Sequence, residues 1–272
     1  MLELKWVYEL ILFLYGLSLI GYFIDFVQNN RKANVIAFWL LSMVWVLQSF
    51  FLLSQLFIKE NFPIMTVYDG LYFYAWILVT FSLIINRLFK VDFLVFFTNV
   101  VGFLIMIIHI STRAQNVLEN RGIALVNELL VIHISLAIVS YGFFTLSFIF
   151  SIMYLLQYRL LKKKKWNAKL FRLGDLTKLD HFSYIAVILG IPLLLIAIIL
   201  GVVWGYVSTD IFYWYDFKTL GSFLVLVVYV VYLFLRIVKG YQGRTISLFN
   251  AAAFLFLLIN FFLFGSLSNF HF

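Results

Sequence analysis

The sequence predicts an all-α, polytopic integral membrane protein, and its composition and its apolar runs carry that prediction. Of its 272 residues, 65% are hydrophobic and 12% are charged, whereas a soluble domain is about 45–50% apolar. The apolar residues lie in runs long enough to cross a hydrocarbon core of about 30 Å as helices, and not in the short alternating strands of a membrane barrel. We therefore expect one domain of membrane-spanning helices over residues 1–272.

Eight runs qualify as membrane-spanning helices when the chain is followed from its start. We expect them at residues 6–27, 35–57, 67–88, 92–110, 129–157, 183–207, 220–236 and 246–265. The first run lacks a small-residue cleavage site, so we expect it to remain as a span and not to be removed as a signal peptide. An even number of spans places both termini on the same side of the membrane.

The Lys and Arg residues indicate which side that is, because short cytoplasmic loops hold the excess of positive charge. Fifteen of the 20 lie in the first, third, fifth and seventh connections: Arg31, Lys32, Arg87, Lys90, Arg159, Lys162, Lys163, Lys164, Lys165, Lys169, Arg172, Lys178, Arg236, Lys239 and Arg244. These connections are expected in the cytoplasm, so both termini are expected outside. The same placement accounts for the pI near 9.5, and no nucleic-acid partner is expected.

One expected cytoplasmic connection, residues 158–181, is strongly basic. Its segment "YRLLKKKKWNAKLFRLGDLTK" holds eight cations. Such a loop can lie on the anionic headgroups of membrane lipid, or it can meet the acidic surface of a cytoplasmic protein. Both interpretations stay open from the sequence.

Histidines are the residues most able to carry chemistry here. The chain has no cysteine, which excludes disulfides, thiolate metal ligands and thiol redox chemistry. By the expected topology His109, His133 and His271 share the outer face, and two of the three could be axial ligands of a haem iron, taken as haem b held without a covalent bond. His181 is expected in the cytoplasm, in a solvated or helix-capping role.

Each of the three outer histidines has an alternative role. His133 lies in the apolar segment "VIHISLAIVSYGFF", where an ionisable side chain is costly and indicates function; the alternative is a hydrogen-bonded packing residue. His109 ends the fourth expected span, where water is near. His271 stands near the end of the sequence, where chain ends fray.

The expected outer connection between the sixth and seventh spans contains the aromatic stretch "FYWYDFKTLG". Tyr213, Trp214 and Tyr215 offer flat faces for a haem ring. Lys218 could pair with a haem propionate, and Asp216 could hold a neighbouring cation or an imidazole N–H. The alternative is an interfacial belt, because Trp and Tyr gather at membrane surfaces in any case.

These residues resemble the cytochrome c assembly superfamily of CcsA-like haem-handling membrane proteins, and within it the shorter HemX-like proteins of Gram-positive bacteria. The outer segment of that family reads as a Trp followed by W-x-W-D-P-K-E, and here Trp204 is followed by "YWYDFKT". Asp216 and Lys218 match the motif. Tyrosines replace two tryptophans, Phe and Thr replace the Pro and Glu, and a further Trp-Gly that the family usually has before the motif is absent, so the resemblance implies a weakened aromatic platform.

Three further patches carry the resemblance over most of the chain. "FPIMTVYDGLYFYAW" (62–76) is similar to the family segment P-x-x-N-L-Y-E-S-L-x-F, "LDHFSYIAVILGIPLL" (179–194) to L-D-x-L-S-Y, and "GYQGR" (240–244) to G-W-Q-G-R. His133 falls in a family pattern, H-x-S-L-x-x-x-S-Y, at the histidine that precedes the aromatic segment. The resemblance therefore implies that His133 is a haem ligand.

Two departures limit what the resemblance implies. A later outer histidine of the family is expected near Leu267, and this sequence has His271 four residues on. The synthetases of the family also carry a histidine inside the membrane, in a Y-L-H-x-R segment, where this chain has Phe234. An inner haem site of that kind is therefore not expected.

The resemblance implies a haem-binding, non-enzymatic regulator of haem biosynthesis that acts on the level of glutamyl-tRNA reductase. Its haem pocket would be closed by residues 208–219, and it would lie in the plasma membrane of a Gram-positive bacterium. One alternative is a component that delivers haem to a cytochrome c synthetase partner during cytochrome c maturation. Another is a haem-free permease or membrane scaffold.

Overall fold

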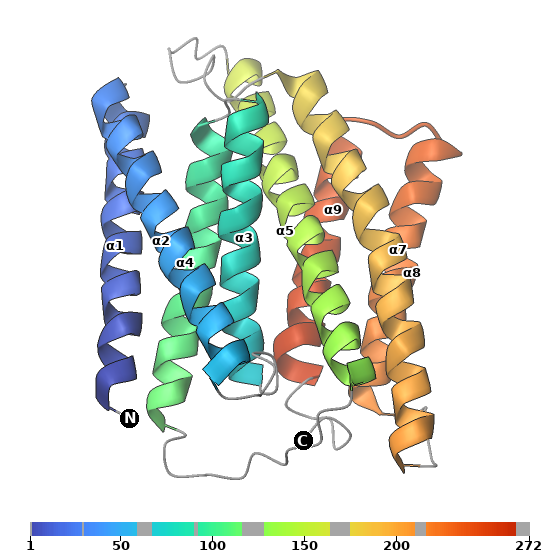
Figure 1. Ribbon diagram of the computed structural model, residues 1–272. Coiled ribbons are helices and arrows are strands. Elements are labelled where there is room, and N and C mark those ends of the chain that lie inside the picture. Colours follow the sequence, from blue (N-terminus) through green and yellow to red (C-terminus); the bar gives the residue numbers. More distant parts are fainter. Residues whose placement is uncertain are drawn as a thin grey trace. The chain divides into compact units, whose positions relative to one another are not determined.

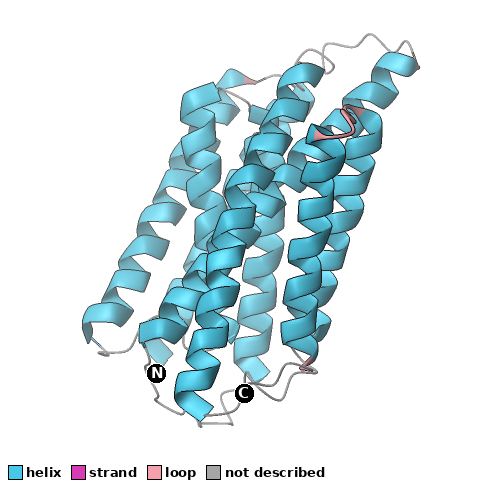
Figure 2. Cartoon of the chain, turned by 90° about the vertical axis from the view of Figure 1, so that its right-hand side faces the viewer, coloured by secondary structure: helices cyan, strands magenta, loops and turns pink. Residues whose placement is uncertain are grey.

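The computed structural model describes residues 2–28, 30–58, 67–89, 92–115, 128–163, 175–209 and 216–264. Its α-helices are α1 (Leu2–Gln28), α2 (Arg31–Ile58), α3 (Val67–Phe89), α4 (Asp92–Gln115), α5 (Glu128–Lys162), α7 (Leu176–Thr209), α8 (Phe217–Ile237) and α9 (Arg244–Ile259), which runs into the π-helical turn η2 (Asn260–Phe264) (Figure 1). Figure 2 shows helices and a few short loops, with no strand in the described ranges. Seven of the eight expected spans lie within one α-helix each, and the eighth, 246–265, begins in α9 and continues through η2. The prediction of an all-α fold is confirmed for the described residues.

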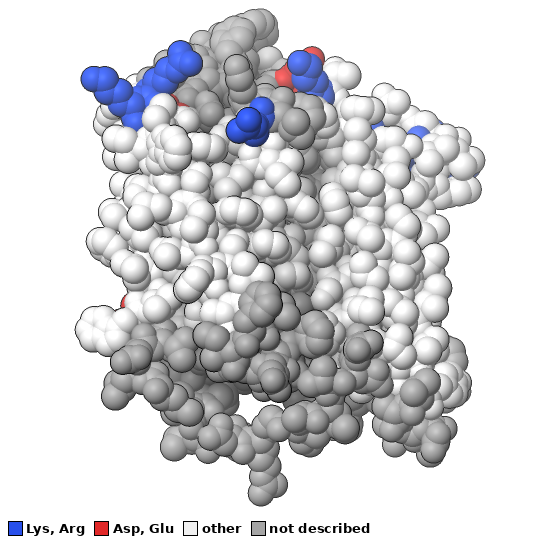
Figure 3. All heavy atoms as spheres, in the orientation of Figure 1, with Lys and Arg blue, Asp and Glu red and all other residues white. Residues whose placement is uncertain are grey.

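The helices are suited to a membrane. Seven of them, among the described residues, are long and apolar enough to cross one by length and composition, and α4 contributes a shorter apolar segment, Leu94–Ile110. Large apolar side chains such as Phe13, Trp39 and Phe50 are 63%, 67% and 72% exposed, which suits contact with lipid and not with water. On the face drawn in Figure 3, most of the surface between the helix ends is neither acidic nor basic. The chain is therefore a multi-pass membrane protein.

The chain divides into two compact units, Met1–Val126 and Asn127–Phe272. In the first unit α1 packs on α2, α2 on α3, α3 on α4 and α4 on α1. In the second unit α5 packs on α7, α7 on α8, α8 on α9 and α9 on α5. Each unit is thus a closed ring of four helices in which sequential helices are neighbours, as short connections require.

A buried polar cluster holds three helices of the second unit together. The Asn250 amide nitrogen on α9 donates to the hydroxyls of Ser147 and Ser151 on α5, at 2.7 and 2.8 Å, and contacts that of Ser183 on α7 at 3.1 Å. Ser147 also donates to the Ser183 carbonyl at 2.8 Å. Inside a membrane such interhelical hydrogen bonds join helices that apolar contact alone would not hold together.

A second polar contact brings together two of the sequence patches that are far apart in the chain. The Arg236 guanidinium at the end of α8 donates to both carboxylate oxygens of Asp180 near the start of α7, at 3.0 and 2.6 Å. The backbone N–H of Gly243 donates to the same carboxylate at 3.3 Å. Asp180 therefore attaches the "GYQGR" turn to α7.

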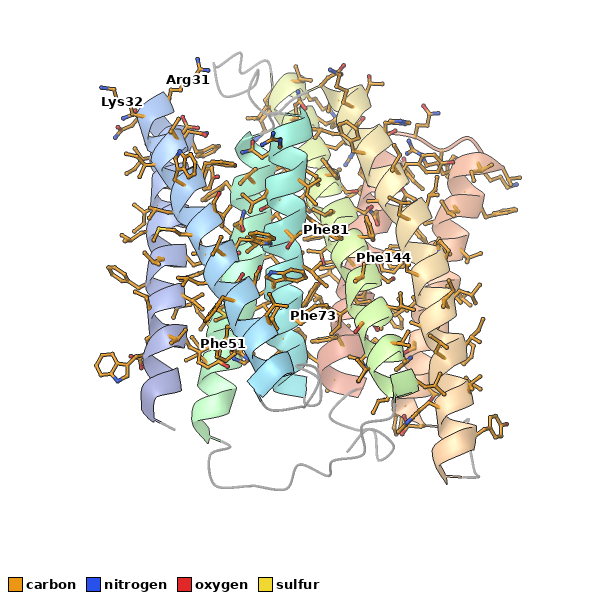
Figure 4. All side chains as sticks on the ribbon, in the orientation of Figure 1. Arg31, Lys32, Phe51, Phe73, Phe81 and Phe144 are labelled. Carbon is orange, nitrogen blue, oxygen red and sulfur yellow. The ribbon has the colours of Figure 1, made fainter. Side chains whose placement is uncertain are left out.

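The basic side chains that the structure describes gather at one end of each unit. In the first unit Arg31, Lys32 and Arg87 lie where α1 and α3 end and α2 begins, and Figure 4 shows Arg31 and Lys32 at the opposite end of α2 from Phe51. In the second unit the described cations lie where α5 and α8 end and α7 and α9 begin, with the exception of Lys218.

Candidate functional site

His133 lies on α5 and bonds to the backbone of α7. Its Nδ1 is 2.5 Å from the carbonyl oxygen of Ala197. A carbonyl can only accept, so Nδ1 carries the proton and, in the neutral ring, the lone pair is on Nε2. Histidines that ligate a metal are usually held in this way, with one ring nitrogen donating to a carbonyl and the other carrying the lone pair that binds the metal.

Gly201 makes room for the imidazole of His133. A Cβ built on Gly201 would lie 2.6 Å from Cε1 of the ring and 2.8 Å from Nδ1, closer than any side-chain carbon can approach. The ring therefore lies directly against the α7 backbone. Small residues allow this kind of close contact between membrane helices.

Trp204, another predicted site residue, lies on α7 three residues after Gly201, so the two share a helix face. It is partly exposed.

In the neighbouring α8, Asp216 is the N-cap residue, and its carboxylate accepts a hydrogen bond from the backbone N–H of Lys218 at 2.9 Å. A carboxylate at this position satisfies a free N–H and offsets the helix dipole.

The Lys218 ammonium lies beside η2. It donates to the carbonyl oxygen of Asn260 at 3.3 Å and lies 5.5 Å from the centre of the Phe261 ring. The Asn260 amide nitrogen donates to the hydroxyl of Tyr141 on α5 at 3.3 Å. Its Oδ1, in a fully buried side chain, has no hydrogen-bond partner within the described residues. A π-helical turn shifts the helical hydrogen bonds and is frequent at functional sites.

These contacts bring four predicted site residues to one end of the second unit. That end contains the start of α5, the end of α7, the start of α8 and η2, and it holds His133, Trp204, Asp216 and Lys218. At these helix ends the structure places an imidazole whose Nδ1 bonds to a backbone carbonyl and an ammonium whose described hydrogen bond goes to an uncharged carbonyl.

No group of three His, Asp or Glu side chains in the described ranges could hold a bare metal ion. A haem iron has no such requirement, because its porphyrin supplies four ligands and the protein adds one or two. Among the described residues at this end of the second unit, His133 is a side chain that could serve as such an axial ligand.

His109 belongs to the first unit, where its side chain is 1% exposed. Its ring centre lies 5.3 Å from that of Tyr8 on α1 and 5.4 Å from that of Tyr72 on α3. Phe51 on α2 completes the cluster, 4.7 Å from Tyr8 and 5.4 Å from Tyr72. The helix-end histidine that the sequence places near water is thus enclosed by aromatic rings.

Four of the predicted site residues lie outside the described residues: Tyr213, Trp214, Tyr215 and His271. The centre of the basic connection, 164–174, lies outside them too. His181 is exposed at the start of α7, and this agrees with its predicted solvated role. Phe234, which stands where synthetases have a membrane histidine, is 50% exposed.

Sequence reasoning missed Ala197, Gly201, Tyr141 and Asn260. The first two act through the backbone, which no side-chain pattern reveals. Asn260 did carry a signal, since a polar amide inside the apolar run "LINFFLF" is costly in a membrane and indicates a function or an interhelical bond.

Comparison with known proteins shows which family this chain matches. A model described as "Cytochrome C assembly protein" matches residues 64–271. "Protein HemX" of Bacillus subtilis (strain 168) is 52% identical over 258 residues, which cover 95% of this chain and 94% of that protein. "Protein HemX" of Brevibacillus brevis is 42% identical over 271 residues, 100% and 99% of the two chains. "Cytochrome c biogenesis protein CcsA" of Prochlorococcus marinus (strain MIT 9301) is 27% identical over 229 residues, 76% and 74%.

Proposed function

Because this chain belongs to the cytochrome c assembly family and is a HemX homologue, we propose that it binds haem b in the membrane and regulates haem biosynthesis through the level of glutamyl-tRNA reductase. Its role is non-catalytic. The two compact units act as one functional domain, and the family match over residues 64–271, which draws on both units, supports this.

The observation that carries the haem proposal is the hydrogen bond from His133 Nδ1 to the Ala197 carbonyl. It assigns the lone pair to Nε2 and fixes the plane of the ring, as an axial ligand requires. Lys218, beside the same helix ends, is the partner for a propionate, since its described hydrogen bond goes to a neutral carbonyl that a carboxylate can replace. Bound haem would supply an iron that His133 could hold as an axial ligand, and the occupancy of the site would follow the supply of haem.

The second axial ligand is His109 or His271, and the enclosure of His109 among aromatic rings favours His271. Trp204 and the aromatic residues Tyr213, Trp214 and Tyr215 form the walls of the haem pocket. Asp216 orients the start of α8, and so the position of Lys218, by capping that helix.

We also propose eight spans with both termini outside, in the plasma membrane of a Gram-positive bacterium. The basic helix ends in each unit support this orientation, because positive charge marks the cytoplasmic side. The apolar segment Leu94–Ile110 of α4 is the eighth span. In this topology His133 and Lys218 lie toward the outer face.

The experiment that tests haem binding is an absorption spectrum of the purified protein, oxidised and reduced, from haem-replete cells. We expect a low-spin haem spectrum that is lost in His133→Ala and in one of His109→Ala and His271→Ala. His181→Ala is the matched control and keeps the spectrum, because that side chain is exposed at the other end of its helix. If wild-type protein shows no Soret band even with added haemin, the haem-binding proposal is wrong and a haem-free permease or membrane scaffold becomes the favoured function.

The regulatory part of the proposal needs a cytoplasmic partner. We propose that this partner binds the basic 158–181 connection. The headgroups of anionic lipid would compete with the partner for the same basic side chains. Replacing Lys162 to Lys165 by serine is expected to change glutamyl-tRNA reductase levels at equal expression of the membrane protein. Unchanged reductase levels would mean that this loop takes no part in the regulation. The proposal that the protein binds haem would not be affected.

A second candidate function is haem delivery in cytochrome c maturation, with a synthetase partner. The match to the cytochrome c assembly family favours it. Phe234, half-exposed in place of the synthetase histidine, speaks against synthetase activity of this chain alone. Deletion of the gene followed by haem staining of membrane c-type cytochromes separates the two functions, since only the delivery role predicts their loss.

A further inference from the structure

Three polar side chains of α5 form hydrogen bonds to backbone carbonyls of α7. The pairs are His133 with Ala197 at 2.5 Å, Ser140 with Gly190 at 2.8 Å, and Ser147 with Ser183 at 2.8 Å. From one pair to the next the donor advances by seven residues along α5, and the acceptor goes back by seven along α7. Two antiparallel helices that cross at a small angle bring the same faces together at this interval. The three bonds therefore lie on one line between the helices, which we call the α5–α7 seam.

The α5–α7 seam runs through the interior of the second unit. The two helices lie side by side (Figure 1), and the seam extends about 21 Å from His133 to Ser147, at 1.5 Å per residue. The side chains of Ser140 and Ser147 are 0% exposed. Because a buried hydroxyl without a partner is costly in apolar surroundings, these bonds hold α5 and α7 in one register.

The direction of the Ser140 bond is unusual for a serine inside a helix. Such a hydroxyl commonly donates to the carbonyl four residues earlier in its own helix. Thr145 on the same helix does so, to the carbonyl of Tyr141 at 2.8 Å, and Ser42 on α2 does so, to that of Phe38 at 2.8 Å. The Ser140 hydroxyl instead donates across to α7. It thus joins two helices where a bond within one helix was available.

Ser140 meets α7 at the turn that a proline weakens. Pro192 lies inside α7, and it has no N–H to donate to the carbonyl of Ile188, four residues earlier. Helices bend most readily at such a point. Gly190, whose carbonyl accepts from Ser140, lies between these two residues. The bond from α5 therefore supports α7 where its own hydrogen bonds are incomplete.

Two glycines of α7 bring the same two helices into close contact along the seam. A Cβ built on Gly190 would lie 2.6 Å from the ring of Phe144, and one on Gly201 would lie 2.6 Å from the ring of His133. The far face of the Phe144 ring is occupied too, because the ring stacks on that of Tyr229 on α8, 3.8 Å between centres. A shift of α5 along α7 would press both rings against the side chains that flank the glycines. Only one register of the two helices satisfies these contacts and the three bonds together.

The orientation of His133 depends on this register. Its acceptor Ala197 lies beyond Pro192 in α7, whereas the Ser140 bond attaches α7 to α5 just before that proline. If α7 bends at Pro192, the carbonyl of Ala197 moves relative to α5, and Nδ1 of His133 loses its acceptor. The bond at Gly190 resists that bend.

We propose that Ser140 is a positioning residue for His133. By donating to the Gly190 carbonyl it keeps the segment of α7 beyond Pro192 in register with α5, so that the Ala197 carbonyl stays within reach of Nδ1. The inference rests on the proposed role of His133 as a haem ligand, since a ligand must present Nε2 in a fixed direction. The orientation of the ring exists before haem binds, and the haem-free protein therefore shows whether Ser140 sets it.

Hydrogen exchange at the imidazole of His133 tests the proposal without haem. The full chain is prepared haem-free in detergent with ¹⁵N-labelled histidine, and His133→Ala identifies the ring resonance by nuclear magnetic resonance. In the wild type we expect an Nδ1 proton that exchanges slowly with water, because it is bonded to a carbonyl. Ser140→Ala should accelerate this exchange by about 3- to 18-fold, the range for one interhelical hydrogen bond in a membrane.

The matched control is Thr145→Val. It removes a buried hydroxyl from the same helix, but one that bonds within α5, so we expect the exchange at His133 to stay at the wild-type rate. Gel filtration and circular dichroism establish that each variant is folded. An unchanged exchange rate in folded Ser140→Ala, or an equal acceleration in Thr145→Val, would overturn the role of Ser140.

Titration with haemin separates this inference from the proposed function. We expect Ser140→Ala to bind haemin more weakly than the wild type and Thr145→Val, and its bound haem to have a higher midpoint potential, because a weaker bond at Nδ1 makes the imidazole a poorer electron donor. A wild type that binds no haemin would refute the haem proposal, and the exchange rates would still decide whether Ser140 orients His133. Haemin binding together with unchanged exchange in Ser140→Ala would refute the positioning role alone.

Discussion

The imidazole of His133 lies against the backbone of Gly201, so closely that a Cβ on that glycine would come within 2.6 Å of the ring. The contact and the hydrogen bond to Ala197 depend on each other. The ring can reach the carbonyl only where α7 has no side chain in its way, as at Gly201. A glycine that no motif singled out thus controls the orientation of the proposed haem ligand.

Gly201→Ala is expected to push the imidazole away from Ala197 and to lower haem affinity by about 10- to 100-fold, the range for lost support of a metal ligand. Titration of the haem-free protein with haemin measures the change. Gly16→Ala is the control, since its Cβ would lie 3.7 Å from Phe103, an ordinary contact. Equal losses in the two variants would mean that the effect is general destabilisation and not misplacement of His133.

Lys218→Gln tests the proposed propionate contact. The variant removes the positive charge and keeps a hydrogen-bond donor, so we expect weaker binding of haemin but little change for haemin dimethyl ester, which has no propionate charge. The wild type should prefer haemin to the ester. If the wild type binds both equally well, Lys218 does not recognise a propionate.

Asp180→Ala leaves the Arg236 guanidinium, with its side chain 10% exposed, without its carboxylate partner. Removal of one partner of a buried ion pair costs about 3–5 kcal/mol, because the remaining charge stays away from water. We expect a lower free energy of unfolding in detergent, followed by circular dichroism. The double variant Asp180→Ala/Arg236→Met should recover most of the loss, and no recovery would show that Asp180 acts through the Gly243 N–H instead.

The two glycines of the "GYQGR" turn form a matched pair for a fourth prediction. Gly240 and Gly243 both have positive φ, 67° and 70°. A Cβ on Gly240 would meet nothing within 4 Å, whereas one on Gly243 would lie 2.7 Å from the Tyr154 hydroxyl. Gly240→Ala should therefore destabilise by about 1 kcal/mol from backbone strain alone, and Gly243→Ala by clearly more. Thermal unfolding of both variants in the same detergent provides the comparison.

The position of each helix could be predicted from the sequence with good accuracy. The expected span at 220–236 lies within α8, Phe217–Ile237, and the expected span at 67–88 lies within α3, Val67–Phe89. Helices extend past the apolar runs because the backbone continues to bond to itself beyond the hydrocarbon. The expected span at 183–207 shows this most clearly, since α7 begins at Leu176.

The candidate site was predicted less completely. His133, Asp216 and Lys218 stood out because an ionisable residue beside or within an apolar run is unusual. Asn260, which accepts from Lys218 through its carbonyl, could not be paired with it, since the two are 42 positions apart and the bond uses the backbone.

The sequence by itself determined which segments span the membrane, which loops carry the positive charge and which family the chain resembles. These properties depend on hydrophobicity, charge and motifs, which are local in the chain. Tertiary structure alone decided that His133 bonds to Ala197, that Asp180 joins Arg236 and Gly243, and that Gln48 is buried without a hydrogen-bond partner among the described residues. Such contacts depend on the packing and rotation of neighbouring helices, which a run of apolar residues constrains only weakly.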